Sequence, residues 1–136
     1  LSEKPTSIFM NETDYSAQVR NAIDQKGGVF ELRTYVTNPG KLDALNQRFN
    51  NHTAKLFAKH GMKNFGYWIP FDTPDSANTL IYLIHHADRK QAAANWKAFA
   101  SDPTWQNARK ESERDGKILA QAPERIFLRA LDFFSH

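Results

Sequence analysis

The chain has 136 residues, a formal net charge of +3 and no cysteine. That length suits one domain with a proper core and is too short for two comfortable ones. The absence of cysteine excludes a disulfide framework, a thiolate nucleophile and a cysteine-based metal site. Lysine and arginine are spread along the chain without an aromatic-interleaved basic tract, so we expect no nucleic-acid partner. The longest apolar runs are of strand length, so we expect a soluble chain without a transmembrane segment.

Residues 1–27 have a looser composition than the rest of the chain, with Pro5, several Ser, Thr and Asn residues and a glycine pair at the end. Four residues would share one face of a short amphipathic helix: Tyr15, Val19, Ala22 and Ile23. A helix of that length is marginal in water unless it docks. We therefore interpret residues 1–27 as a partly ordered N-terminal arm that the fold does not need, and residues 28–136 as the domain.

The domain alternates between strand and helix patterns. Asp88 and the Asp102-Pro103 pair are typical helix starts, and Gly61 is a typical helix end. The predicted elements are a strand at residues 29–37, a helix at 41–60, strands at 62–71 and 78–86, a helix after Asp88, a helix from Pro103 to about Leu119 and a strand at 125–134. This order is typical of an α+β, ferredoxin-like split βαβ sandwich, in which the helices cover one face of an antiparallel sheet.

The strand at residues 79–84, Thr-Leu-Ile-Tyr-Leu-Ile, is apolar on both faces. Such a strand needs cover on both sides of the sheet. The helices cover one side, and the economical cover for the other is the sheet of a second copy related by a two-fold axis. The sequence therefore predicts a homodimer.

The predicted helix at residues 41–60 places polar residues where a core should be apolar. Its apolar stripe consists of Leu42, Leu45, Phe49 and Leu56. On this spacing His52, Thr53 and His60 also point inward, where an unpaired polar group would cost free energy. Four basic residues are expected to form a solvated flank of the same helix: Lys41, Arg48, Lys55 and Lys59.

Both inward histidines have a structural and a functional interpretation. His52 is either a ligand-binding or acid–base group, or a core histidine that a strand residue satisfies. His60 lies beside the helix end, where an imidazole can bind the terminal carbonyls. The two cannot share a metal ion, because eight residues of helix separate them by about 12 Å. We expect no metal site and no cofactor.

Glu31, Arg33 and Tyr35 alternate along the first strand and share one face of it. Arg33 either anchors an anionic ligand or pairs with Glu31 or with residues near Arg129 across a dimer interface, and the paired interpretation is favoured because interior charges usually have partners. The aromatic residues further along are mostly expected in the core, with a subset lining a cavity between sheet and helices. They are Tyr67, Trp68, Tyr82, Trp96, Phe99 and Trp105.

Several spaced segments resemble the NIPSNAP family. They include Phe-Glu-Leu-Arg-Thr-Tyr at residues 30–35, Leu-Phe-Ala-Lys-His-Gly-Met at 56–62, Gly-Tyr-Trp at 66–68 and Asp-Pro-Thr-Trp at 102–105. The resemblance covers roughly residues 28–133. It implies a dimeric α/β barrel, a fold shared with small cofactor-free monooxygenases and haem-handling proteins, and it leaves the reaction open.

Two classes of function remain. The first is a dimeric, non-enzymatic module that binds a small hydrophobic or aromatic ligand or a protein partner. The second is a cofactor-independent monooxygenase-like enzyme in which His52 or Tyr35 assists proton transfer on a small aromatic substrate. A phosphate-binding glycine loop, a His-Glu-x-x-His motif and a nucleophile elbow are absent from the sequence. The candidate pocket residues are Arg33, Tyr35, His52, His60, Tyr67, Tyr82, Trp96 and Trp105.

Overall fold

The computed structural model describes residues 10–24, 27–71, 74 and 76–129. The strands are β1 (Met10–Glu12), β2 (Val29–Val36), β3 (Lys63–Pro70), β4 (Thr79–His86) and β5 (Glu124–Arg129). The helices are α1 (Ser16–Val19), α2 (Leu42–Arg48), the π-helix η1 (Phe49–Thr53), α3 (Ala54–Lys59), the 3-10 turn η2 (Ser76–Asn78), α4 (Arg89–Ala100) and α5 (Pro103–Ser112). None of the helices in the described residues is long and apolar enough to cross a membrane.

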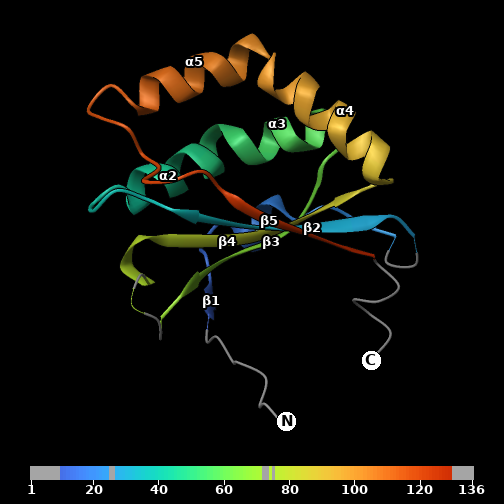
Figure 1. Ribbon diagram of the computed structural model, residues 1–136, viewed down its shortest axis with the longest axis horizontal. Coiled ribbons are helices and arrows are strands. Elements are labelled where there is room, and N and C mark those ends of the chain that lie inside the picture. Colours follow the sequence, from blue (N-terminus) through green and yellow to red (C-terminus); the bar gives the residue numbers. More distant parts are fainter. Residues whose placement is uncertain (1–9, 25–26, 72–73, 75, 130–136) are drawn as a thin grey trace, which may run out of the picture.

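The strands form one antiparallel sheet in the order β1-β3-β4-β2-β5. Helices α2 to α5 lie together on one side of this sheet (Figure 1). The predicted α+β class is therefore confirmed. The last predicted strand begins one residue early, at Glu124, and its expected end at residues 130–134 lies outside the described residues.

The ends of the helices follow from local chemistry. The Asp88 carboxylate accepts a hydrogen bond from the Gln91 backbone N–H, as expected of an N-cap. Gly61 has φ of +84°, and the chain reverses there because that conformation is inexpensive only for glycine. Helix α5 ends at Ser112 and not near Leu119 as predicted, and a turn at Gly116 with φ of +125° follows.

The predicted single helix at residues 41–60 is interrupted by a π-helical turn. Across η1 the Ala54 N–H donates to the Phe49 carbonyl, five residues earlier, so one extra residue is wound into the helix. The extra residue rotates everything after it, and Thr53 and Phe57 face the sheet while His52 faces solvent. The expectation that His52 points inward is therefore wrong. The prediction assumed a regular helical period throughout and therefore did not include the π-turn.

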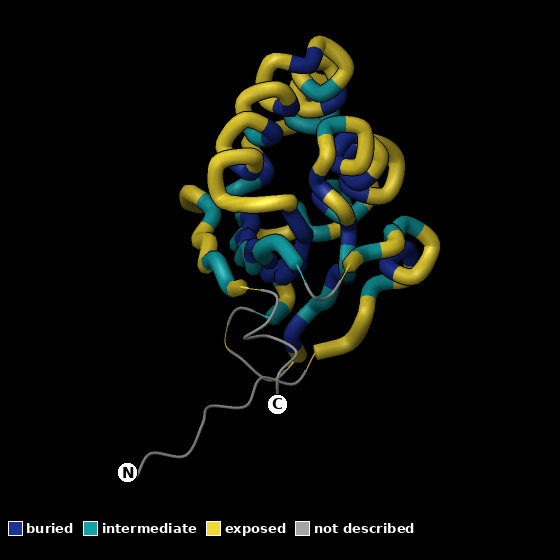
Figure 2. Tube along the Cα trace, turned by 90° about the vertical axis from the view of Figure 1, so that its right-hand side faces the viewer, coloured by how far each residue is buried: buried dark blue, intermediate teal, exposed yellow. Residues whose placement is uncertain are grey.

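The core lies between the helices and the sheet, and its centre is aromatic. Phe49, Phe57, Tyr67 and Tyr82 are fully buried there, and the Tyr67 and Tyr82 rings stack with centroids 5.2 Å apart. In Figure 2 the helices are exposed along their outer sides and buried along the sides that face the core. Each such ring contributes roughly 2–3 kcal/mol by burial. This cluster holds the helices on the sheet.

The opposite face of the sheet, which we call the open face, is only partly covered. Leu83 and Ile81 on β4 are buried within the single chain, at 2% and 8% exposure. Phe65 and Trp68 pack against the cluster of Leu83, and Trp68 lies opposite Ile81 in the sheet. Toward β5 the described residues leave this face more open, and Ile126 is 57% exposed. The central strand is therefore buried within the single chain, and exposed apolar residues remain at both edges of this face, Ile126 on β5 and Met10 on β1.

The described part of the N-terminal segment packs on the domain. Strand β1 pairs with β3, from Met10 opposite Pro70 to Glu12 opposite Trp68. The buried Tyr15 ring lies 5.3 Å from that of Tyr67, and its hydroxyl donates to Asn46 Oδ1 at 2.6 Å. Residues 10–24 thus form an edge strand and part of the core. The expectation that the fold does not need this arm conflicts with these contacts.

We predict that Tyr15→Ala lowers the free energy of unfolding by about 3 kcal/mol, since it removes a buried ring and its hydrogen bond. Urea denaturation measures the change. The neighbouring variant Gln18→Ala alters an exposed residue and should stay within about 0.5 kcal/mol of the original chain. A loss below about 1 kcal/mol for Tyr15→Ala would restore the interpretation of a dispensable arm.

Candidate functional site

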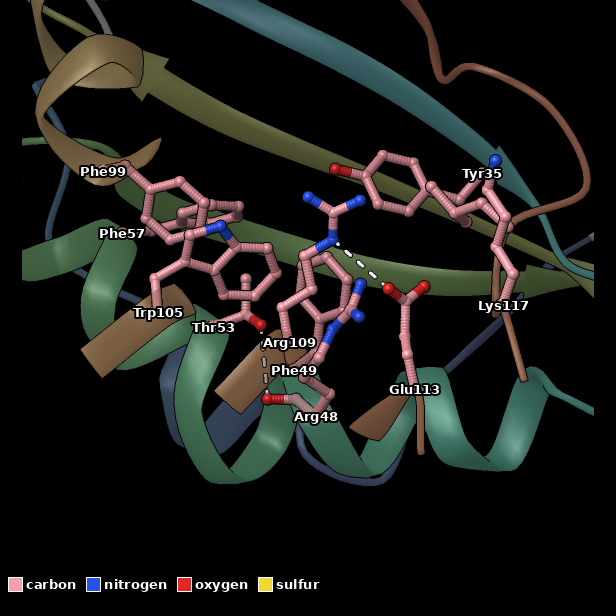
Figure 3. Close-up of a pocket in the computed structure, with 11 residues that line it drawn as sticks. Tyr35, Arg48, Phe49, Thr53, Phe57, Phe99, Trp105, Arg109, Glu113 and Lys117 are labelled. Atoms are coloured by element: carbon pink, nitrogen blue, oxygen red, sulfur yellow. Dashed lines mark hydrogen bonds and ion pairs between the residues drawn. The ribbon is translucent and has the colours of Figure 1, made fainter. Parts of the chain in front are cut away.

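A cavity of about 140 Å³ opens between β2, the α2–η1–α3 helix and helix α5 (Figure 3). Aromatic rings form one side and charged side chains the other. The residues that line it are Tyr35, Arg48, Phe49, Thr53, Phe57, Phe99, Trp105, Arg109, Glu113, Lys117 and Leu119.

The first side, which we call the ring wall, consists of Phe49, Phe57, Phe99 and Trp105. The rings are held by one another: the Phe57 and Phe99 centroids are 4.9 Å apart, and the Phe99 and Trp105 centroids are 4.6 Å apart. Such tilted pairs contribute about 0.5–1.5 kcal/mol beyond the area they bury. The ring wall is a preformed apolar surface.

The second side, which we call the cationic wall, consists of Arg48, Arg109, Lys117 and the single carboxylate Glu113. In Figure 3 the arginine side chains reach into the middle of the cavity. Arg109 Nε donates to Glu113 Oε1 at 3.3 Å, one helical turn along α5. Lys117 lies in the segment that follows α5 and is exposed.

Arg48 is the buried member of the cationic wall, at 6% exposure. Its guanidinium carbon lies 4.9 Å from the centroid of Trp105, and Nη1 donates to Ser112 Oγ at 3.1 Å. Its Nε is buried without a hydrogen-bond partner. Burial lowers the pKa of this guanidinium below its usual value, although arginine stays charged at neutral pH.

Tyr35 connects the cavity to a buried polar network. Its hydroxyl accepts a hydrogen bond from Arg33 Nη2 at 3.2 Å and shares another with the Tyr82 hydroxyl at 2.9 Å. Burial raises the pKa of Tyr82 well above its usual value, so this hydroxyl remains protonated. Tyr67 is in the same layer and donates to Asn64 Oδ1.

Glu31 is the acidic centre of that network and is fully buried. It accepts hydrogen bonds from His86 Nε2 and Trp96 Nε1, both at 2.8 Å, and from Arg33 Nη1 at 2.9 Å. Burial raises the pKa of Glu31, but the hydrogen bonds from His86, Trp96 and Arg33 together with the charge of Arg33 outweigh it and lower the pKa. The pairing of Arg33 with Glu31 is confirmed.

His60 takes part in a different contact, at the end of α3. Its Nε2 lies 2.7 Å from Asp102 Oδ2, which also accepts a hydrogen bond from Lys59 Nζ at 3.0 Å. The other oxygen of Asp102 accepts from the Thr104 N–H at 2.8 Å and caps α5. Asp102 therefore ties the end of α3 to the start of α5, and His60 does not line the cavity.

His52 lies outside the cavity as well. It is exposed and borders a shallow surface depression, together with Gln47, Asn51 and Glu111. Its position follows from the π-turn, which carries the side chain away from Tyr35 and Tyr82. No described contact links His52 to the polar network or to the ring wall.

The structure brings together only part of the predicted pocket. Tyr35 and Trp105 line the cavity, while Arg33, Tyr67, Tyr82 and Trp96 lie in the polar network or the core behind it. Sequence reasoning missed Arg109, Glu113 and Lys117 and assigned Arg48 to a solvated flank. The four-residue spacing of Arg109 and Glu113 was a usable signal for one face of α5, whereas the burial of Arg48 depends on the packing of α5 over α2, where it meets Ser112.

The chemistry available in the cavity is recognition by rings and cations. The described residues contain no group of three or more His, Asp or Glu side chains that could hold a metal ion. Tyr35, Glu113 and Lys117 are the described lining groups able to exchange a proton. The arrangement suits a ligand with an apolar ring and a polar or anionic end.

The fold and the cavity define a ferredoxin-like α+β domain that holds a small site between its sheet and its helices. The NIPSNAP family model matches residues 30–133, so the chain belongs to the NIPSNAP family. No curated protein matches the chain.

Solved structures of NIPSNAP proteins share the fold. A NIPSNAP family protein of unknown function from Agrobacterium tumefaciens is 17% identical with a TM-score of 0.63, over 76% of this chain and 88% of that chain. An uncharacterised NIPSNAP domain protein from Burkholderia xenovorans is 20% identical with a TM-score of 0.61, over 74% and 91%.

We predict that the Asp102 contact makes stability depend on acid pH. Hydrogen bonds from His60, Lys59 and the Thr104 N–H lower the pKa of Asp102. Because the pKa of Asp102 is lower in the folded chain than in the unfolded chain, its charge stabilises the fold fully above the unfolded pKa of about 4. This stabilisation is lost as the pH falls through the folded pKa. Asp102→Asn keeps the cap but removes the charge, so its melting temperature should be a few degrees lower at pH 7. The difference should narrow steadily as the pH falls below about 4, and a pH-independent difference would contradict this origin.

Proposed function

We propose that this chain binds a small aromatic or hydrophobic ligand in the cavity between its sheet and its helices. The observation that supports this proposal is the ring wall, four aromatic side chains around a space of about 140 Å³. A dry cavity of similar size, about 150 Å³, is known to bind benzene. The rings are already packed against one another, so little ordering accompanies binding.

We also propose that the chain acts as a homodimer through its open face. That face carries half-buried Leu32 and Val36 on β2 and exposed Ile126 on β5. Exposed apolar residues next to a sheet edge favour association, because burying them removes about 25 cal/mol per Å² from water. The cavity lies on the helix side, so ligand binding and dimerisation use different surfaces.

A cofactor-independent oxygenase is the second candidate. The Tyr35 hydroxyl borders the cavity and is held by Arg33 and Tyr82, which suits a proton-transfer role on a bound phenol or quinol. Oxygen consumption with such a substrate supports the enzyme. A bound molecule recovered unchanged supports the binding module.

We predict that Leu119→Trp reduces ligand binding by at least tenfold, because the larger ring fills the cavity that Leu119 lines. Native mass spectrometry of freshly purified protein reports any retained small molecule, and titration with benzyl alcohol reports the affinity. The matched variant His52→Leu changes an exposed residue outside the cavity and should bind as the original chain does.

Equal binding by the original chain and Leu119→Trp would remove the cavity from the proposal. A loss of binding in His52→Leu with an unchanged melting temperature would return His52 to the site. Oxygen uptake that Leu119→Trp abolishes would select the oxygenase over the binding module.

We predict a mass near twice 15.6 kDa in sedimentation at micromolar concentration, and dissociation of the dimer by Ile126→Asp. A charge at this exposed apolar position is easily hydrated in a monomer and costly in an interface. The control Arg125→Asp alters the preceding residue, which points to the other face of β5. A folded monomer for the original chain, or a dimer that survives Ile126→Asp, would contradict the proposed interface.

A further inference from the structure

The cationic wall carries more positive charge than its carboxylate balances. Arg48, Arg109 and Lys117 line the cavity, and among the described residues Glu113 is the only acidic one that does. Glu113 Oε1 accepts from Arg109 Nε at 3.3 Å, and Oε2 accepts from the Ile118 N–H at 3.1 Å. Both of its oxygens are therefore engaged, and the wall keeps a net positive charge.

Arg48 shows the imbalance most clearly. Arg48 is only 6% exposed, and its Nε has no hydrogen-bond partner. Among the described residues no carboxylate lies within ion-pair distance of it, and its one hydrogen bond goes to the neutral Ser112 hydroxyl. Glu113 lies close enough to act on this charge but forms no ion pair with it. A buried cation without an ion-pair partner is costly, and an anion in the cavity would lower that cost.

The size of the cavity limits the rest of the ligand. A volume of about 140 Å³ suits one six-membered ring, as the benzene-binding cavity of about 150 Å³ shows. The ring wall offers flat faces for that ring, and Arg48 lies beside it, over Trp105. The apolar and anionic recognition elements are thus adjacent.

We propose that the cavity takes a single-ring aromatic carboxylate, with the ring against Phe57, Phe99 and Trp105 and the carboxylate against Arg48 and Arg109. This inference rests on the proposed ligand-binding function and adds the charge of the ligand. Guanidinium groups match a carboxylate with two parallel hydrogen bonds. Arg48 lost much of its hydration when the chain folded, so the incoming carboxylate meets a preorganised cation.

The experiment compares benzoate with benzyl alcohol, which has the same ring and a neutral polar end. Isothermal titration of the full chain at one fixed ionic strength measures both affinities. Benzoate should bind at least tenfold more tightly, the difference expected for a hydrogen-bonded charge. Acetate, which lacks the ring, should bind at least tenfold more weakly than benzoate.

Arg109→Gln and Arg48→Gln should each reduce benzoate affinity about tenfold and leave benzyl alcohol affinity within twofold. The Arg109 side chain is 59% exposed, so its replacement keeps the fold and gives a result even if Arg48→Gln does not fold. Lys110→Gln removes the same charge from the next residue of α5, which is exposed and does not line the cavity. It should leave the preference for benzoate unchanged.

The outcomes separate the two proposals. If benzyl alcohol binds as tightly as benzoate, the charge assignment is overturned and the binding module stands. If no aromatic probe binds, both are overturned. If Lys110→Gln abolishes the preference for benzoate as fully as Arg109→Gln does, the preference comes from the overall charge of α5. The proposed role of the cationic wall is then overturned.

Discussion

The buried carboxylate of Glu31 is the constraint on which the helix side of this fold depends. A buried carboxylate must find its partners where it lies, and three donors from three elements hydrogen-bond to it: the charged Arg33 on β2, His86 on β4 and Trp96 on α4. These bonds fix the rotation of α4 over the sheet. That rotation directs Phe99 toward Phe57 and thereby completes the ring wall.

The π-turn has the comparable role on the neighbouring helix. Its extra residue turns Thr53 and Phe57 toward the cavity, which Arg48 and Phe49 also line. A regular helix satisfies its backbone with better geometry, so a π-turn persists where the surrounding packing compensates. Here the compensation is visible in Phe49, whose ring contacts Tyr35, Phe57, Tyr67 and Tyr82.

Local patterns predicted the strands, the caps at Asp88 and Asp102 and the turn at Gly61, because each depends on a few neighbouring residues. They predicted the pairing of Arg33 with Glu31, since alternation places both on one face of β2. They did not predict the position of His52, because a π-turn leaves no periodic signal and shifts every later residue by about one position. They also missed the docking of residues 10–24. The loose composition of this segment gives no strand signal, and its edge strand forms by pairing with β3.

The candidate site was predicted less well than the fold for a related reason. Tyr35 and Trp105 lie in the cavity, but the charged residues opposite them come from α5 and the segment after it. Their proximity to Arg48 depends on how α5 crosses α2, a tertiary feature fixed by the bend at Asp102. The His60, Lys59 and Thr104 contacts to that carboxylate set the bend, and none of them is visible as a motif.

Two arginines in this chain make a natural comparison. Arg33 and Arg48 each place a guanidinium over a tryptophan ring, at 4.2 Å from Trp96 and 4.9 Å from Trp105. Arg33 has a carboxylate at 2.9 Å, whereas Arg48 has only a serine hydroxyl. Stacking on a ring contributes about 2 kcal/mol when desolvated, less than the several kcal/mol that burying a charge costs. Arg33 thus has a carboxylate at ion-pair distance within the chain, although its Nε, like that of Arg48, has no hydrogen-bond partner. We propose that an anion in the cavity supplies the partner that Arg48 lacks.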